Sequence, residues 1–174
     1  RGLGDVYKRQ VFQNPRSQFF NVDTTSEITF GCENLGQPER SIRERLEKTV
    51  RDFRLEKLMG RNIFHLSGGE KQKIACAGVS IMEPDVLVMD EPSSNLDASS
   101  ILDLRSILAF WKSQGKTIIV SEHRLYYLRG LADRFIYMGD RWTPENAIDG
   151  RYIWLPIRFE GEQPVIEWQS EWSY

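Results

Sequence analysis

Cysteine and histidine are scarce in this sequence of 174 residues, which contains two of each. Cys32 and Cys76 lie far apart and show none of the spacings typical of metal sites, which favours buried thiols in a reducing cytoplasm. No apolar run reaches the roughly 18 residues that a transmembrane helix needs, and no signal peptide is visible. We therefore expect a chain that is not exported and that reaches a membrane only through partner subunits.

An excess of charge of either sign is also absent. The chain has 23 Lys and Arg against 25 Asp and Glu, a formal net charge of −2 and a pI of about 5.8. This balance provides neither the basic surface that nucleic acid requires nor a polybasic membrane anchor. With 40% hydrophobic and 28% charged residues, the composition is that of an ordinary globular chain, long enough for one domain with a hydrophobic core.

The most informative stretch is Leu-Ser-Gly-Gly-Glu-Lys-Gln-Lys at residues 66–73. Ser67 can N-cap the helix that follows, and Gly68 and Gly69 let the backbone approach a ligand closely. Free amides and the positive end of the helix would then face outward, which predicts an anion site. A Ser-Gly-Gly sequence by itself is more often only a helix-capping loop.

A second informative stretch is the apolar run at residues 86–89, which is followed directly by Asp90 and Glu91. Such a run is typical of a parallel strand that is buried on both faces. It delivers two adjacent carboxylates to the carboxyl end of the strand, where they could hold a magnesium ion and a water molecule. The alternative is that the pair only begins a solvated loop.

Further helices and strands follow from periodicity. Thr25 or Ser26 can cap a helix that runs to Asn34, and a second helix from about Ser41 carries one apolar stripe. The helix after residue 97 carries another, formed by Ile101, Leu104, Leu108 and Trp111. A buried strand at 117–120, a short helix at 125–131 and a last apolar strand at 135–138 complete an alternation that predicts an α/β fold with a parallel sheet.

These features form an ordered set: Gln13, residues 66–73, the pair Asp90 and Glu91, residues 94–97 (Ser-Asn-Leu-Asp) and His123. The set resembles the ATP-binding-cassette (ABC) ATPases, the motor domains of ABC transporters. The resemblance covers residues 11–139. It implies a P-loop NTPase-like parallel sheet, the RecA-like core, incomplete here, with an inserted helical subdomain at 21–65 and a core region at 66–139. It also implies ATP and Mg²⁺ as cofactors.

The resemblance assigns the catalytic roles to residues that match the family's motifs. Asp90 would bind magnesium through water, and Glu91 would be the general base or the residue that positions the attacking water. His123 would contact the γ-phosphate, and Gln13 would reach toward both the magnesium ion and the attacking water.

The resemblance also implies partners. Ser67, Gly68 and Gly69 would close over the γ-phosphate held by a second ABC ATPase domain, in a homo- or heterodimer, and Asp97 would belong to the loop that contacts that domain. Glu70 stands where the family more often has glutamine, and its role stays open. The helical subdomain would dock on transmembrane subunits, which would place the protein at the cytoplasmic face of the cell membrane.

The two ends of the chain fall outside the resemblance. Residues 5–10 resemble the translated end of a transposon used to prepare sequencing libraries, so residues 1–10 are set aside as an artefact; the alternative is a genuine basic edge strand. Residues 140–174 hold four of the five tryptophans and are either an extension specific to this protein or an out-of-frame read. The phosphate-cradling sequence G-x-x-x-x-G-K-[ST] does not occur, which predicts a fragment that is inactive alone.

The sequence thus predicts a piece of an ABC ATPase that, when complete, powers import across a membrane. Residues 14–25 further resemble the branch that serves energy-coupling-factor and cobalt-type importers, for vitamins and transition-metal ions. Two alternatives stay open. One is a soluble cassette ATPase of DNA repair or translation, which would have a basic face or an inserted coiled coil. The other is a non-catalytic module that supplies only the signature at 66–73 to a partner's site.

Overall fold

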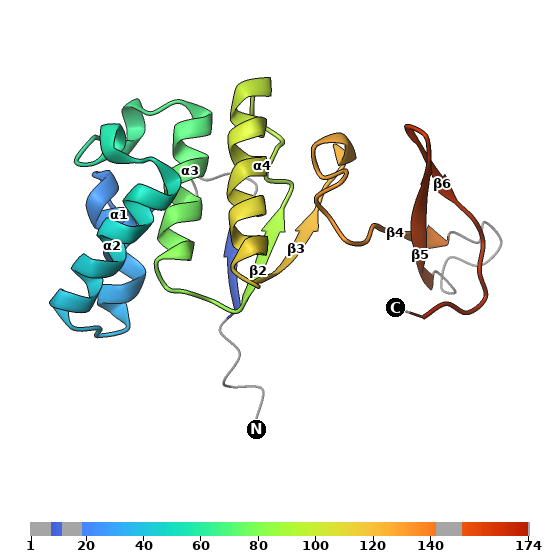
Figure 1. Ribbon diagram of the computed structural model, residues 1–174, viewed down its shortest axis with the longest axis horizontal. Helices are drawn as coiled ribbons and strands as arrows, with labels where there is room; N and C mark the ends of the chain where they lie inside the picture. The colour runs from blue at the N-terminus through green and yellow to red at the C-terminus, as the bar shows by residue number, and fades with distance from the viewer. Residues whose placement is uncertain (1–7, 12–18, 142–150, 174) are drawn as a thin grey trace. The chain divides into compact units, whose positions relative to one another are not determined.

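The computed structural model describes residues 8–11, 19–141 and 151–173, which fall into two compact units. The first unit, Arg1–Tyr127, combines a parallel sheet with helices, and the second, Leu128–Tyr174, contains an antiparallel sheet (Figure 1). The predicted α/β class with a parallel sheet is confirmed for the first unit. Within the described residues, no helix is both long and apolar enough to cross a membrane.

The sheet of the first unit has the order β1-β2-β3, and its three strands are parallel. They are β1 (Lys8–Val11), β2 (Val86–Asp90) and β3 (Thr117–Ser121). The central strand pairs on both sides, with Met89 opposite Val11 in β1 and Val120 in β3. All three strands therefore end at the same edge of the sheet, at the top of Figure 1.

Strand β1 begins inside the segment that we set aside on sequence grounds. Lys8, Arg9 and Gln10 pair in register with Val86, Leu87 and Val88 of β2. Backbone hydrogen bonds of a ladder do not depend on the identity of the side chains, so this pairing leaves open where the residues come from. That residues 1–10 are an artefact stays a prediction.

The prediction that β2 is buried on both faces is wrong for the described part of the chain, and so is the prediction that β3 is a buried strand. Leu87 and Met89 are buried, whereas Val86 and Val88 are only half-buried. In β3, Ile119 is 56% exposed. Helix α3 packs against β1 and α4 against β3, so side chains that alternate toward the other face stay accessible.

The helical part begins with α1 (Thr24–Asn34), whose N-cap is Asp23. Asp23 Oδ1 accepts hydrogen bonds from the backbone N–H groups of Thr25 at 2.9 Å and Ser26 at 3.0 Å. The predicted caps, Thr25 and Ser26, are therefore wrong, because these residues already lie in the first turn. Hydrogen bonds from the Ser26 hydroxyl and backbone hold the pKa of Asp23 below its usual value.

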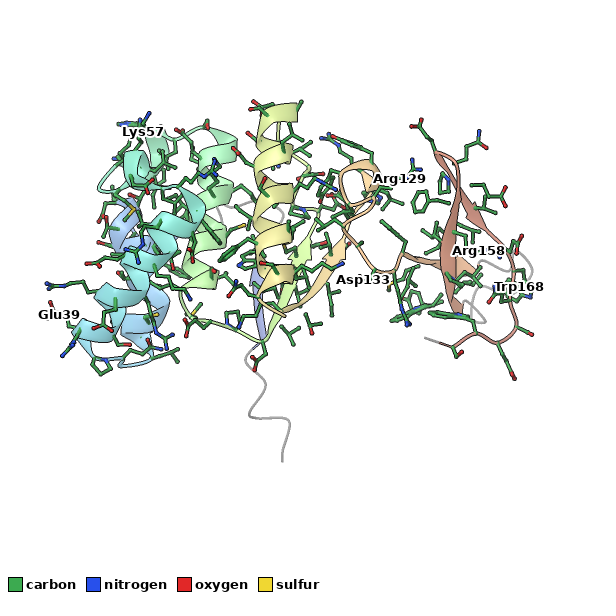
Figure 2. All side chains as sticks on the ribbon, in the orientation of Figure 1. Glu39, Lys57, Arg129, Asp133, Arg158 and Trp168 are labelled. Atoms are coloured by element: carbon green, nitrogen blue, oxygen red, sulfur yellow. The ribbon has the colours of Figure 1, made fainter. Side chains whose placement is uncertain are left out.

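Helix α2 (Glu39–Phe53) begins two residues before the predicted start, directly after Pro38. Pro38 has φ −60°, which already suits a helix entrance. The predicted stripe consists of Ile42, Leu46, Val50 and Phe53, of which Ile42 and Phe53 are buried and the other two are half-buried. The charged face points outward, as Glu39 does in Figure 2.

Two short 3-10 turns, η3 (Glu56–Leu58) and η4 (Ile63–His65), lead into α3 (Gly68–Ser80). The next helix, α4 (Ala98–Ser113), follows β2. The prediction for its apolar stripe is confirmed, because all four members are at most 3% exposed: Ile101, Leu104, Leu108 and Trp111. Together with Ile74 and Cys76 of α3, this stripe forms the core over the sheet.

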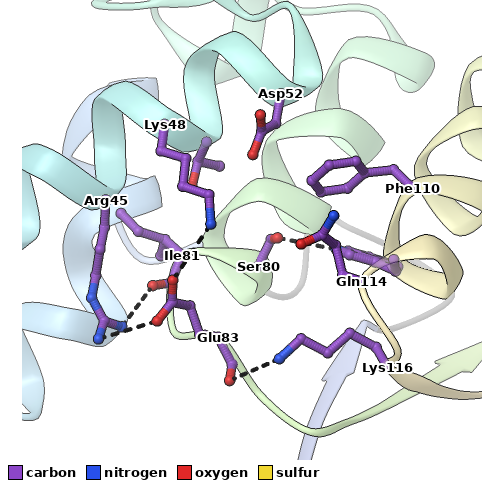
Figure 3. A pocket seen from close by; sticks show the side chains of 11 residues that line it. Arg45, Lys48, Asp52, Ser80, Ile81, Glu83, Phe110, Gln114 and Lys116 are labelled. Carbon is purple, nitrogen blue, oxygen red and sulfur yellow. Dashed lines mark hydrogen bonds and ion pairs between the residues drawn. The ribbon is translucent and has the colours of Figure 1, made fainter.

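A cavity of about 300 Å³ lies between α2, the end of α3 and the end of α4 (Figure 3). Glu83 lines this cavity and contacts three cations. The Glu83 carboxylate pairs with Arg45 at 3.3 Å and Lys48 at 3.8 Å, and the Glu83 backbone carbonyl accepts from Lys116 Nζ at 3.4 Å. Arg45 also donates to the carbonyl of Ile81 at 3.2 Å. Arg45 and Lys116 thus contact carbonyls at or just after the carboxyl end of α3, where positive charge is favourable.

The predicted helix at 125–131 is wrong. Only the short turn η5 (Leu125–Tyr127) forms, and Gly130 then takes a left-handed φ of 69° that a continuing helix cannot contain.

The second unit contains β4 (Ile136–Arg141), β5 (Arg151–Glu160) and β6 (Gln163–Ile166), paired in sequence order. Strand β4 pairs antiparallel with β5, with Met138 opposite Trp154. The strand predicted at 135–138 therefore belongs to this sheet and not to the parallel one. Whether residues 140–174 are an extension or an out-of-frame read stays untested.

Candidate functional site

The predicted site residues that the structure describes gather at one edge of the first unit. Strands β2 and β3 end there, and α3 and α4 begin there, at the top of Figure 1. In open α/β sheets, the carboxyl ends of the strands are the general location for ligands. Gln13 lies outside the described residues.

Glu91 and His123, predicted as catalytic, lie side by side at this edge. Glu91 Oε1 is 3.1 Å from His123 Nε2. Glu91 has a left-handed φ of 41°, and its N–H donates to the carbonyl of Ser121 at 2.8 Å. The turn after β2 is thereby tied to the end of β3, which brings together two residues that are 32 positions apart in the chain.

Asp90 ends β2, where it pairs with Ser121 and is exposed. Among the described residues, no group of three or more His, Cys, Asp and Glu side chains is arranged to hold a metal ion. Magnesium in phosphoryl-transfer sites needs no such cage, because one or two carboxylates, water and substrate phosphates complete its shell. An exposed carboxylate at this edge therefore fits a magnesium ion that arrives with a nucleotide.

The start of α3 is a capping box. Ser67 Oγ accepts from the backbone N–H of Glu70 at 3.2 Å, and Glu70 Oε2 accepts from the N–H of Ser67 at 2.8 Å. The prediction that Ser67 caps the helix is confirmed, and Glu70 gains the role that stayed open. The hydrogen bond from the Ser67 backbone is the main cause that holds the pKa of Glu70 below its usual value.

The two glycines of the signature allow close approach of the chain itself. A Cβ atom on Gly69 would lie 2.0 Å from Ser100 Oγ, and one on Gly68 would lie 3.3 Å from the carbonyl oxygen of Asn95. Side chains at these positions would separate α3 from the start of α4. Whether a ligand also uses this space stays a prediction.

Asp97 is the N-cap of α4. It accepts from the backbone N–H of Ser100 at 2.8 Å, and the hydrogen bonds from Ser100 lower its pKa. Its side chain is exposed at the same edge as Ser67. That Asp97 contacts a second ATPase domain stays a prediction.

Two residues at this edge were missed by the sequence analysis. Lys71 is only 5% exposed, and its Nζ donates to the carbonyls of Leu66 at 2.7 Å and Phe64 at 3.4 Å. Glu122, beside His123, accepts four hydrogen bonds from the two loops that follow β2 and β3. No sequence pattern that we used identifies either residue, because most of their partners are backbone groups, which any residue carries.

A parallel α/β sheet with a capped helix end and two adjacent carboxylates at its carboxyl edge is an arrangement found in P-loop NTPase-like nucleotide-binding proteins. The family model described as ABC transporter matches residues 5–94. The chain therefore belongs to the ABC transporter family.

Similar proteins carry matching names. A putative ABC transporter ATP-binding protein of Treponema denticola is 56% identical over 128 residues, which cover 74% of this chain and 26% of that protein. The energy-coupling factor transporter ATP-binding protein EcfA of Methanoculleus marisnigri is 39% identical over 132 residues, 75% of this chain and 47% of that protein. The chain thus spans between a quarter and a half of the length of these relatives.

The structure of CbiO1 from Clostridium perfringens, part of the ABC transporter complex CbiONQ, is similar in fold. It shares a TM-score of 0.68 and 32% identity with this chain, over 74% of this chain and 51% of CbiO1. The predicted fold class is confirmed by this similarity.

Proposed function

We propose that this chain is part of an ATP-binding-cassette ATPase that, in the complete protein, hydrolyses ATP to power import across a membrane. The observation that carries the proposal is the 3.1 Å contact between Glu91 and His123 at the carboxyl edge of the parallel sheet. It joins a carboxylate able to orient water to an imidazole able to donate to phosphate.

The residues of this edge have separable tasks. Glu91 accepts a proton from the attacking water or orients it. Its place in a backbone turn directly after β2 holds the Glu91 carboxylate at the carboxyl edge of the sheet. His123 is 85% exposed in its side chain, so it is accessible to the γ-phosphate. Asp90, together with Gln13, would hold the magnesium ion, which when bound neutralises phosphate charge.

A second ATPase domain follows from the signature. Ser67 and Gly68 are exposed at the positive end of α3. In our proposal they close over the γ-phosphate that a partner domain holds, and Asp97 contacts that domain. Because G-x-x-x-x-G-K-[ST] does not occur in the 174 residues, we propose that this chain alone does not hydrolyse ATP.

The transported substrate is proposed to be a vitamin or a transition-metal ion, the class implied by the resemblance of residues 14–25. The relatives named as energy-coupling factor transporter ATP-binding proteins and CbiO1, part of a transporter complex, support the importer branch but their names state no substrate. The protein would act at the cytoplasmic face of the membrane, attached through transmembrane subunits.

The test starts with sequencing the source locus upstream of the Val11 codon and downstream of the Gly139 codon. The complete protein is then expressed, and Glu91→Gln is compared with wild type and with Glu44→Gln, the same change on the exposed face of α2. We expect Glu91→Gln to keep ATP binding and to lower turnover by about 100-fold or more. Unchanged turnover would remove Glu91 from the mechanism.

A second function is favoured by one observation. The signature is fully formed within this chain, because the capping box and the Lys71 contacts need no other polypeptide. The chain is thus suited to supply only the signature to a partner's nucleotide. Nucleotide retention that requires both this chain and an intact partner domain would support this role, and tight ATP binding by this chain alone would exclude it.

A further inference from the structure

We propose that Glu122 is a positioning residue for the reaction: its carboxylate holds His123 against Glu91 by joining the loops that follow β2 and β3. This inference rests on the proposed function, because it assigns a role in the same hydrolytic site. Glu122 lies next to His123 in sequence, and its carboxylate accepts hydrogen bonds both from its own loop and from Ser93 in the neighbouring loop.

One oxygen of Glu122 organises its own loop. Oε1 accepts from the backbone N–H of His123 at 2.8 Å and from that of Arg124 at 3.1 Å. The two N–H groups directly after a strand would otherwise have no ladder partner, and the carboxylate closes them into a turn. Because the His123 side chain is 85% exposed, little packing holds the ring. The position of its backbone, together with the contact with Glu91, therefore sets where Nε2 lies.

The other oxygen reaches the loop that carries Glu91. Oε2 accepts from the backbone N–H of Ser93 at 3.3 Å and from the Tyr127 hydroxyl at 2.9 Å. Ser93 follows Glu91 by two residues and is fully buried. A second link runs beside it, from Arg124 Nη1 to the carbonyl of Ser93 at 3.3 Å. Glu122 thus holds both members of the 3.1 Å pair through one carboxylate.

The positioning role requires that both carboxylate oxygens of Glu122 accept hydrogen bonds. Burial raises the pKa of Glu122, but its hydrogen bonds with Ser93, Arg124, Tyr127 and His123 outweigh burial and leave the pKa below its usual value. The group is therefore ionised and accepts only, as four donors demand. A glutamine has the same shape, yet its NH₂ group would face either the two amides of residues 123 and 124 or the amide of Ser93.

The test uses the complete protein and steady-state ATP hydrolysis. We expect Glu122→Gln to lower kcat by about 10-fold with KM for ATP changed less than about twofold, since the loss falls on positioning and not on nucleotide binding. Glu44→Gln, on exposed α2, is the matched control and is expected to leave both constants unchanged. In a His123→Ala background, Glu122→Gln should add less than about twofold, because the residue acts through His123.

A second variant separates the two oxygens and covers the case in which Glu122→Gln does not fold. In Glu122→Asp the shorter carboxylate can still accept from the backbone N–H of Arg124, two residues ahead, but it is one methylene too short to reach the N–H of Ser93. Glu122→Asp is expected to fold and to have a kcat between those of wild type and His123→Ala. A kcat of Glu122→Asp equal to that of the wild type would overturn the proposal that the link from Glu122 to Ser93 positions His123.

The outcomes distinguish this inference from the proposed function. If Glu91→Gln and His123→Ala both keep wild-type turnover, the proposed site is wrong. If these two lose turnover while Glu122→Gln behaves like Glu44→Gln, the site stands and the positioning role is wrong. Equal loss from Glu122→Gln with and without His123 would also overturn it, because the effect would then not pass through the histidine.

Discussion

Gly69 and Ser100 lie so close that a Cβ atom on Gly69 would sit 2.0 Å from Ser100 Oγ and 2.7 Å from Ser100 Cβ. The first turn of α3 thus packs against the first turn of α4. The signature at 66–73 and the loop at 94–97 therefore lie next to each other. The position of the exposed Ser67 depends on this contact.

Gly69→Ala is expected to destabilise the complete protein by about 1–3 kcal/mol, because the added methyl overlaps Ser100. Gly78→Ala in the same helix is the matched control: its Cβ would meet only atoms at 3.6 Å or beyond, so it should be neutral or stabilise by up to about 1 kcal/mol. Thermal unfolding measures both. Ser100→Gly should restore the Gly69→Ala variant; failure of that rescue would show that the overlap is not the cause.

Lys71 holds the turn before the signature, so Lys71→Met is expected to loosen it. Methionine fills the buried space but leaves the carbonyls of Leu66 and Phe64 without this donor, at a cost of about 2 kcal/mol. Hydrogen exchange at the Ser67 and Glu70 amides should speed up. Lys57→Met, on an exposed residue (Figure 2), should leave these amides unchanged. Equal exchange in the two variants would contradict the role of Lys71.

Asp23 makes the start of α1 sensitive to acid. Its pKa is lowered in the folded protein, so its stabilising effect is complete above the usual value of about 3.8 and is lost as pH falls through the lower folded value. Asparagine can also cap the helix but does not titrate, so Asp23→Asn should make the melting temperature less dependent on pH in that window. Asp23→Ala should lose about 1 kcal/mol at neutral pH. If the melting temperature of Asp23→Asn depended on pH as that of the wild type does, the acid sensitivity would come from other carboxyl groups.

Strand β3 presents an apolar edge in the described part of the chain, where it pairs only with β2. We expect the 174-residue chain to aggregate when it is expressed alone, through this edge. Ile119→Lys, at a side chain that is 56% exposed, should raise the soluble fraction. Leu102→Lys makes the same change at a 64% exposed position on α4 and should not. A cooperative, monomeric melt of the unaltered chain would contradict the expectation.

Local features were predictable from the sequence because they depend on neighbours within one helical turn. Ser67 and Asp97 cap their helices through amides three residues ahead, and the stripe of α4 follows from helical spacing alone. The cap of α1 was assigned two or three residues too late, since Asp23, Thr25 and Ser26 are all good caps and only the path of the chain selects among them.

The sequence by itself determined the family-like motifs, the cap of α3, the apolar stripe of α4 and the succession of α3, β2, α4 and β3. The tertiary structure alone decided which side chains meet. The contact of Glu91 with His123, the reach of Glu122 to Ser93 and the overlap site at Gly69 join loops or helices that are far apart in the chain. It also decided that β2 and β3 are covered on one face, because burial depends on which elements pack against a strand and not on its own apolar run.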